Sequence, residues 1–146
     1  MDRLEKDDYF LEIAETVAKR GTCSRRQVGC VLVNSSGHIV ATGYNGVPKN
    51  FKHCIDNPCE GAIYPSGEGL DKCEAIHAEI NAFLQLRSDD NYLTMYTTVT
   101  PCIACAKVIC NSNVKKIISL HQYSQDTLYM FAVAGISLDT KYPVDY

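Results

Sequence analysis

The order of the predicted strands and helices is the sequence feature that most constrains the fold. A helix is predicted over residues 6–20, where apolar residues recur at helical spacing, and a hairpin over 28–33 and 38–45, around a turn-forming stretch. Helices and strands then alternate, at 74–87 (helix), 93–99 (strand), 100–111 (helix), 117–120 (strand), 124–134 (helix) and 136–141 (edge strand). This alternation implies a three-layer α/β/α sandwich with a central mixed five-stranded sheet.

Length and composition indicate an ordinary globular chain. It has 146 residues, 46% hydrophobic and 21% charged, so we expect a single domain over residues 1–146. The net charge of −3 and the isoelectric point of about 5.7 argue against nucleic acid as a partner. No apolar run approaches the ~18 residues that a membrane span needs, and the first residues show no secretory signal. We therefore expect a cytoplasmic protein with no membrane partner.

The eight cysteines indicate metal binding rather than disulfide bonds, because the expected compartment is reducing. An irregular, cysteine-rich insert is predicted at about residues 46–73, where Gly, Pro and Asn are also frequent. A segment of this length without regular structure is usually functional or tied down by other groups. Both observations make zinc the first metal to consider.

Two short motifs carry the residues with metal chemistry: His-Ala-Glu at 77–79 and Pro-Cys-Ile-Ala-Cys at 101–105. Thr100 is predicted as the N-cap of a helix, with proline at its first position, so Cys102 and Cys105 would lie in the first turn and face one way. The positive helix end favours their thiolate forms. With the histidine they make three zinc ligands and leave a fourth position for water, which is typical of catalytic sites.

Glu79 supplies the second half of a hydrolytic site. Residues two apart in a continuous helix point to different sides, so His77 and Glu79 cannot both face a metal from mid-helix. In the first turn, however, a long glutamate can reach water on a metal that His77 holds. Zinc brings the pKa of such water near 7, and a carboxylate can take its proton. Each motif alone has other interpretations, such as a redox pair, half a zinc finger or a chance match. Together the two motifs favour a catalytic zinc site.

The two motifs match the zinc nucleobase-deaminase signature, H-x-E followed by P-C-x-x-C. The chain specifically resembles the deoxycytidylate (dCMP) deaminases of the short bacterial and phage type, from about residue 8 to residue 135. The matching segments are TCSRRQVG (22–29), GYNGVP (43–48), KHC (52–54), CEAIHAEINA (73–82) and TPCIACAK (100–107). Cys30 departs from the family, which usually has alanine there, and we interpret it as a core residue. The resemblance implies the cytidine-deaminase-like fold.

The resemblance also implies the reaction, which is hydrolysis of dCMP to dUMP and ammonia, supplying dUMP for thymidylate synthesis. Zinc would be held by His77, Cys102 and Cys105, and water would attack C4 of the pyrimidine. Glu79 would take the proton of that water, protonate N3 and then help ammonia to leave. The family mechanism therefore agrees with the one expected from the residue types alone.

Substrate contacts are expected from residues around these motifs, namely Asn45, Ala78, Thr100, Tyr123, Arg25 and Arg26. Asn45 in GYNG resembles the family's substrate-binding asparagine, although GYNG can also be a simple turn. Tyr123 is expected against the base, with packing at the rim as the alternative. Arg25 and Arg26 offer planar guanidinium groups that match phosphate oxygens, although arginines before a strand are commonly solvated.

A second, structural zinc site is predicted from four of the remaining cysteines, which have counterparts in the family. Its expected ligands are Cys23, Cys54, Cys59 and Cys73, with His53 as a substitute. Such a closed site would hold the insert in place, whereas the alternative is scattered buried thiols. Cys30 and Cys110 fall on an apolar strand and helix and are expected to pack in the core.

The resemblance further implies a homo-oligomer, commonly a hexamer, that dCTP activates and dTTP inhibits with the aid of Mg²⁺. One alternative is another zinc deaminase, acting on a cytosine nucleoside, tRNA adenosine, guanine or a pterin-like ring. The acidic isoelectric point weakens the tRNA case. The other alternative is a non-catalytic zinc module for interaction, and Glu79 argues against it, because a structural site needs no carboxylate beside the metal.

Overall fold

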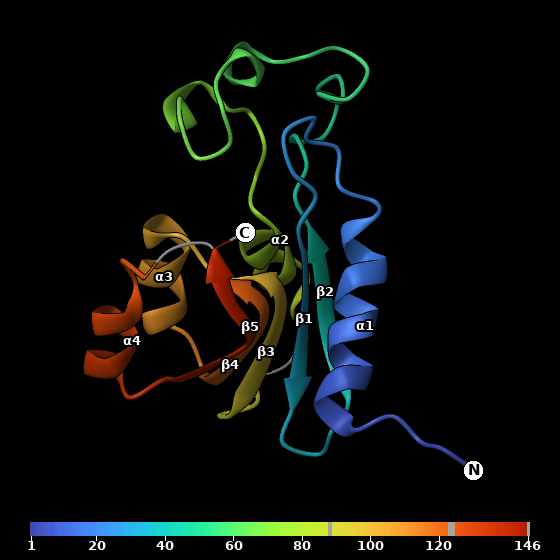
Figure 1. Cartoon of the computed structure of the whole chain (residues 1–146), viewed down its shortest axis with the longest axis vertical. Coiled ribbons are helices and arrows are strands. Elements are labelled where there is room, and N and C mark those ends of the chain that lie inside the picture. Colours follow the sequence, from blue (N-terminus) through green and yellow to red (C-terminus); the bar gives the residue numbers. More distant parts are fainter. Residues whose placement is uncertain (88, 123–124, 146) are drawn as a thin grey trace.

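The computed structural model describes residues 1–87, 89–122 and 125–145, and within them five strands form one mixed sheet (Figure 1). The strands are β1 (Gly29–Asn34), β2 (Ile39–Tyr44), β3 (Leu93–Val99), β4 (Val114–Gln122) and β5 (Ser137–Asp145). Their order is β2-β1-β3-β4-β5; β1 is antiparallel to both of its neighbours, and β3, β4 and β5 run parallel. The predicted hairpin, the mixed sheet and the edge position of the last strand are confirmed.

Helices cover both faces of the sheet, which confirms the three-layer α/β/α architecture. Helix α1 (Lys6–Ala18) packs on one face, against β1 and β3, and lies alone on that side in Figure 1. Helices α2 (Ala78–Gln85), α3 (Ile103–Cys110) and α4 (Leu128–Ala134) lie on the opposite face. None of the helices in the described part of the chain is long and apolar enough to cross a bilayer.

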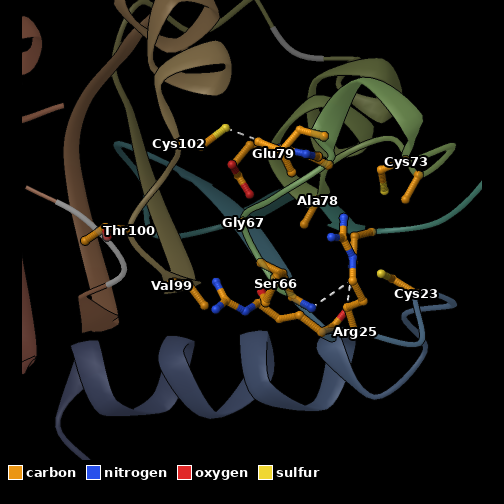
Figure 2. A pocket seen from close by; sticks show the side chains of 16 residues that line it. Cys23, Arg25, Ser66, Gly67, Cys73, Ala78, Glu79, Val99, Thr100 and Cys102 are labelled. Atoms are coloured by element: carbon orange, nitrogen blue, oxygen red, sulfur yellow. Dashed lines mark hydrogen bonds between the residues drawn. The ribbon is translucent and has the colours of Figure 1, made fainter. Parts of the chain in front are cut away.

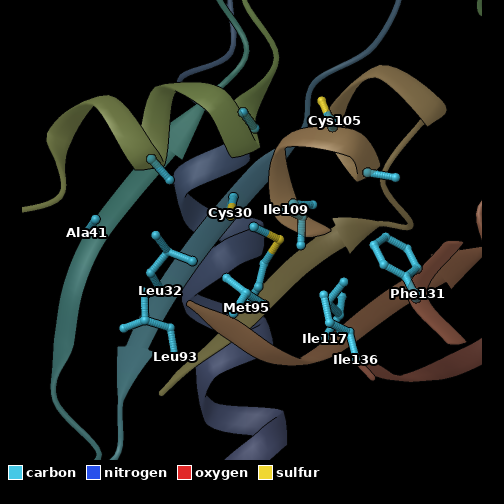
Figure 3. Close-up of a cluster of buried hydrophobic side chains, with 14 residues drawn as sticks. Cys30, Leu32, Ala41, Leu93, Met95, Cys105, Ile109, Ile117, Phe131 and Ile136 are labelled. Carbon is cyan, nitrogen blue, oxygen red and sulfur yellow. The ribbon is translucent and has the colours of Figure 1, made fainter. Parts of the chain in front are cut away.

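The alternation of side chains along the strands builds two hydrophobic layers. In β1, Leu32 faces the layer under α2, α3 and α4, whereas Val31 faces α1. Figure 3 shows the larger layer, where Met95 and Ile117 of the sheet lie near Phe131 of α4. Because β1, β3 and β4 are covered on both faces, most of their residues are buried, without the alternation of a strand that is covered on one face.

Two glycines on neighbouring strands allow the helices to approach the sheet closely. A Cβ on Gly29 would overlap backbone atoms of α1, at Ala14 and Ala18. A Cβ on Gly43 would overlap backbone atoms of α2, at Ala78 and Ala82. Gly43 pairs with the residue next to Gly29. Helices α1 and α2 therefore both approach the sheet closely, from opposite faces, at the end where α2 begins. That contact fixes the start of α2, on which the functional motif lies.

The cysteine-rich insert connects β2 to α2 and projects beyond the end of the sheet (Figure 1). It contains two short 3₁₀ turns, η1 (Glu60–Ile63) and η2 (Leu70–Lys72). A bridge between Gly46 and Ile76 closes its base, with N–H to carbonyl distances of 3.1 and 2.8 Å in the two directions. The insert therefore occupies residues 46–76, slightly more than the predicted 46–73.

Several predicted helix starts were wrong. Helix α2 begins at Ala78 rather than 74, because the preceding residues are extended and pair with Gly46. Helix α3 begins at Ile103, and its N-cap position is Cys102 rather than Thr100. Thr100 precedes a proline, which disfavours helical backbone, and its N–H donates to the carbonyl of His121 in β4 at 3.0 Å. Of the predicted helix 124–134, the structure has Leu128–Ala134, and residue 124 lies outside the described residues.

Candidate metal and active site

The starts of α2 and α3 bring three metal-binding side chains together. His77 is the N-cap of α2 and Cys102 the N-cap of α3, while Cys105 lies three residues further along α3. The Nδ1 atom of His77 is 3.2 Å from the Sγ of Cys105 and 3.4 Å from the Sγ of Cys102. Residues from two separate helices thus converge on one point, as the sequence predicted.

The donor set fits a zinc ion. The ligand atoms of His77, Cys102 and Cys105 lie within 4.8 Å of one another, and no other such group of three occurs among the described residues. Zinc at 2.0–2.3 Å from nitrogen and sulfur separates tetrahedral ligands by roughly 3.5 Å, close to the separations seen here. One imidazole and two thiols are also the ligand types that zinc prefers. These three residues would hold the metal and leave a fourth position open.

The three side chains influence one another's protonation states. Contacts with the thiol of Cys105 and with His77 lower the pKa of Cys102 to about 4 despite its burial. Contact with Cys102 raises the pKa of His77 to about 9. The same contact with Cys102, together with burial, raises the pKa of Cys105. Without metal, the site therefore holds one thiolate beside an imidazolium, and metal would replace the protons on His77 and Cys105.

Glu79 lies beside this group and is almost fully buried, with 4% of its surface exposed. Burial raises the pKa of its carboxyl group, and the nearby Cys105 thiol and the charge of His77 oppose that rise. His77 has an extended backbone, whereas Glu79 lies in the first turn of α2. The side chains of both residues can therefore face the metal-binding group, as expected for a helix start. Figure 2 shows Glu79 and Cys102 directed toward the same part of the pocket.

A pocket opens in front of Glu79, and most of the predicted substrate residues line it. They are Arg25, Arg26, Asn45, Ala78 and Thr100, which lie together with the metal ligands His77 and Cys102. Ala78 and Thr100 are buried in its wall. Tyr123 lies outside the described residues, so the structure does not test its expected contact with the base.

Asn45 is held by the backbone of the loop before β1. Its Oδ1 atom accepts a hydrogen bond from the N–H of Val28 at 2.8 Å, and its Nδ2 donates to the carbonyl of Arg26 at 2.7 Å. The side chain is 7% exposed. Asn45 thus fixes the loop that carries both arginines as well as lining the pocket, and the second Nδ2 hydrogen is the group it can offer to a substrate.

Arg25 lines the pocket and also binds the backbone of the insert. Its Nη1 atom donates to the carbonyls of Tyr64, Pro65 and Glu68 in the insert, at 3.3, 2.9 and 2.5 Å. Its guanidinium also lies beside the thiols of Cys73 and Cys23 (Figure 2). The sequence could not indicate this arrangement, because the acceptors are main-chain atoms about 40 residues away.

The four cysteines predicted for a second zinc are only partly together. The Sγ atoms of Cys54 and Cys59 are 3.6 Å apart, and Cys23 and Cys73 lie beside Arg25. No three of these donors, with or without His53, form a metal-sized group in the described part of the chain. Burial disfavours the thiolate of Cys54, but hydrogen bonds with Ser24 and Cys59 outweigh it and lower its pKa to about 7.

The two remaining cysteines pack as expected. Cys30 is fully buried in the larger hydrophobic layer, and its burial raises the pKa of its thiol. Cys110 is half-buried against the same layer, with its Sγ 3.6 Å from the carbonyl of Met130. The sequence did not predict that the insert itself reaches the pocket, where Ser66, Gly67 and Leu70 form part of the wall.

Comparison with known proteins agrees with this site. The sequence model of the family described as "Cytidine and deoxycytidylate deaminase zinc-binding region" matches residues 4–121. The deoxycytidylate deaminase of Mycobacterium phage D29 is 37% identical over 126 residues, which cover 81% of this chain and 96% of the phage protein. The deoxycytidylate deaminase of Schizosaccharomyces pombe is 36% identical over 138 residues, or 90% of this chain. The chain spans only 42% of that yeast relative's length.

A solved structure has the same fold over nearly its whole length. The crystal structure of dCMP deaminase from the cyanophage S-TIM5 in complex with dCMP and dUMP aligns with a TM-score of 0.77 at 26% identity. The alignment covers 96% of this chain and 99% of the cyanophage chain. With the zinc-type donor set, the buried glutamate and the family match over most of the sequence, this chain belongs to the cytidine and deoxycytidylate deaminase family.

Proposed function

We propose that this protein hydrolyses dCMP to dUMP and ammonia in a zinc-dependent reaction. The observation that carries the proposal is the buried carboxyl group of Glu79 beside the donor atoms of His77, Cys102 and Cys105. A purely structural metal site has four protein ligands and no need of a neighbouring acid. The choice of dCMP is supported by the deoxycytidylate deaminases at 32–37% identity and by the cyanophage enzyme whose structure holds dCMP and dUMP.

Zinc, when held by His77, Cys102 and Cys105, supplies an activated water at neutral pH. Glu79 does the proton transfers. It accepts a proton as water attacks C4 of the cytosine ring and delivers that proton to N3. It then takes the proton of the hydroxyl group added at C4 and passes it to the exocyclic amino group, which leaves as ammonia while the C4 carbonyl forms. Burial suits this role, because it raises the pKa of the Glu79 carboxyl group and so makes the carboxylate a better proton acceptor.

The pocket wall orients the nucleotide for this reaction. Asn45, Ala78 and Thr100 are proposed to position the base and sugar, because they line the pocket beside Glu79. Arg26 lines the same pocket and is proposed as a phosphate contact. The phosphate contact predicted for Arg25 stays a prediction that must compete with three carbonyls for the same guanidinium.

Ammonia release from four substrates tests the proposal: dCMP, CMP, deoxycytidine and cytidine, at equal concentrations and with zinc-loaded protein. We expect turnover of dCMP at least ten times faster than that of the other three. Release from cytidine but not from dCMP would overturn the choice of substrate and favour a nucleoside deaminase. No release from any of them, with zinc bound, would favour the non-catalytic module.

A second, structural zinc that joins the insert to the segment between α1 and β1 is proposed, with Cys23, Cys54, Cys59 and Cys73 as ligands. The proximity of Cys54 to Cys59 and the shared neighbour Arg25 of Cys23 and Cys73 support it, since a guanidinium would offset the negative charge of four thiolates. The two pairs must approach each other when metal binds. Zinc analysis of freshly purified protein decides the matter: two ions per chain are expected, and one would remove the second site.

Control by dCTP and dTTP, with Mg²⁺, and assembly into a hexamer are proposed from the family resemblance. A dCMP saturation curve with and without each effector tests the regulation. We expect dCTP to lower the substrate concentration at half-maximal rate and dTTP to raise it. Identical curves would remove allosteric control, and a molar mass in solution of one chain, about 16 kDa, would remove the oligomer.

A further inference from the structure

One segment of the insert, residues 64–69, closes on itself and lies over the pocket; we name it the strap. Inside it, the N–H of Glu68 donates to the carbonyl of Pro65 at 3.0 Å. Gly69 has a φ of 59°, a left-handed conformation that favours glycine, and a Cβ there would overlap the ring of Tyr64. The ring therefore lies against Gly69, and the strap forms a closed turn.

The carbonyls of the strap point toward a single nitrogen. Nη1 of Arg25 donates to the carbonyl oxygens of Tyr64, Pro65 and Glu68 at 3.3, 2.9 and 2.5 Å. An arginine has only donors and carbonyls offer only acceptors, so the two hydrogens on Nη1 are shared among the three carbonyls. Hydrogen bonds that involve a charged donor are about twice as strong as neutral ones. Arg25 is thus the main side-chain attachment of the strap among the described residues.

The strap forms part of the substrate pocket. Ser66 and Gly67 lie between the carbonyls that Arg25 binds, and both line the pocket with Glu79 (Figure 2). Arg25 in turn stands on a fixed base, because Asn45 holds the backbone at Arg26 and Val28. A chain of contacts therefore runs from the end of β2, through the arginine loop, to the pocket wall.

We propose that Arg25 is a positioning residue that fixes the strap as a wall of the substrate pocket, and that the strap sets the affinity for the nucleotide rather than the rate of the chemical step. The proposal rests on the proposed function, since it assumes that the pocket takes dCMP. It gives Arg25 a role besides the predicted phosphate contact, because Nη1 already donates to three carbonyls of the strap.

Two measurements on zinc-loaded protein test the proposal. The first is amide hydrogen exchange of peptides that cover residues 64–70, without nucleotide. The second is the pair kcat and KM for dCMP. A phosphate ligand matters only when substrate is present, whereas a strap anchor matters in its absence as well.

The variants are Arg25→Gln, Arg25→Lys and Gly69→Ala, with Arg20→Gln as the matched control. Arg20 is an exposed arginine five residues earlier, outside the pocket, so its loss removes the same charge without touching the strap. Lysine keeps three donors on one nitrogen and should recover part of the Arg25→Gln effect. Gly69→Ala displaces the ring of Tyr64 and disturbs the strap without changing Arg25.

We expect Arg25→Gln to raise the exchange rate of the strap about ten-fold and the KM about ten-fold, with kcat within two-fold of the original. Gly69→Ala should do the same, and the double variant should be no worse than the stronger single, because both act on one element. Arg20→Gln should match the unmodified protein. A raised KM with unchanged exchange would overturn the proposal in favour of direct substrate contact.

Raised exchange with an unchanged KM would also overturn it, since the strap would then not be a wall for the substrate. Failure of the proposed function has a different signature: the unmodified protein would release no ammonia from dCMP. In that case the strap is judged by exchange and by the binding of dUMP, measured calorimetrically. Equal amide hydrogen exchange of the strap in the unmodified protein and in Arg25→Gln would show that Arg25 does not fix the strap, whatever the activity of the enzyme.

Discussion

The sandwich and the insert are held together by different means, although both contribute to the same pocket. In the sandwich, β1, β3 and β4 are covered by helices on both faces, and residues such as Ile117 are fully buried. In the insert, Gly46, Cys54 and Gly61 are the buried residues among 46–76. Its shape depends instead on turns, on the bridge at its base and on a few side chains such as Arg25.

This difference separates chemistry from recognition. The metal ligands and Glu79 stand at helix starts that the sheet fixes, within the tightly packed layer or at its edge. The insert adds only a wall, through Ser66 and Gly67. Reacting groups must keep their positions to a fraction of an ångström, and packing provides that, whereas a wall can tolerate a less stable segment.

The largest expected effect is on chemistry, at Glu79 in the sandwich. Glu79→Gln keeps the size of the side chain and removes its proton transfer, so we expect kcat for dCMP to fall by at least about 10³-fold. Zinc content and the circular dichroism spectrum should not change. Turnover within ten-fold of the unmodified protein would remove Glu79 from the mechanism.

A side chain in the core and one in the insert should contribute differently to stability. Ile117→Ala creates a cavity in a fully buried layer, and we expect it to lower the free energy of unfolding by about 3–4 kcal/mol in urea titrations. Ile63→Ala, at a residue of the insert that is 81% exposed, should change it by less than about 0.5 kcal/mol. Similar losses in both variants would mean that the insert is part of the cooperative core.

Backbone approach offers a sharper version of the same comparison. Gly43→Ala places a Cβ into the backbone of α2, so we expect a loss of about 2–3 kcal/mol and, because α2 carries Glu79, a loss of activity. Gly46→Ala, at the base of the insert, has its tightest contact with the side chain of Thr22 at 3.1 Å and meets no backbone atom, so it should cost about 1 kcal/mol or less. Urea unfolding of both variants measures the difference, and equal costs would contradict it.

Loss of the proposed second zinc should affect the insert and leave the sandwich unchanged. Cys59→Ser is expected to lower the zinc content by one ion per chain and to expose the insert to limited proteolysis within residues 46–76. The sandwich should resist cleavage, because all five of its strands are paired in one sheet that is covered by helices. An unchanged zinc content would show that Cys59 binds no metal, and Cys110→Ser serves as the control, since Cys110 packs against the core.

The smallest effect concerns a single hydrogen bond within the sandwich. The hydroxyl of Tyr96 donates to the carboxylate of Asp7 at 2.7 Å, which joins β3 to the second residue of α1. Tyr96→Phe should lower the free energy of unfolding by about 1–2 kcal/mol. Tyr129→Phe, at a residue 70% exposed, should leave the free energy of unfolding unchanged. Equal unfolding free energies for the two variants, in thermal or urea unfolding, would show that the bond does not contribute to stability.

The regular elements and the metal ligands could be predicted because their signals are local. Strand β3 has the predicted ends, Leu93–Val99, and a Thr-Pro pair follows it directly. The starts of α2 and α3 were misplaced, because pairing with Gly46 and with His121 keeps the preceding residues extended. Those partners are distant in the chain, and no local pattern indicates them.

The sequence by itself determined the α/β alternation, the three donors of the metal group and the acid beside them, because residue type and spacing within a helix start specify that chemistry. Only the tertiary structure decided what the arginines and the insert do. Arg25 binds the carbonyls of Tyr64, Pro65 and Glu68, and carbonyl groups are the same in every residue, so the side-chain sequence carries no trace of them. Recognition by backbone atoms becomes visible only when the chain has folded.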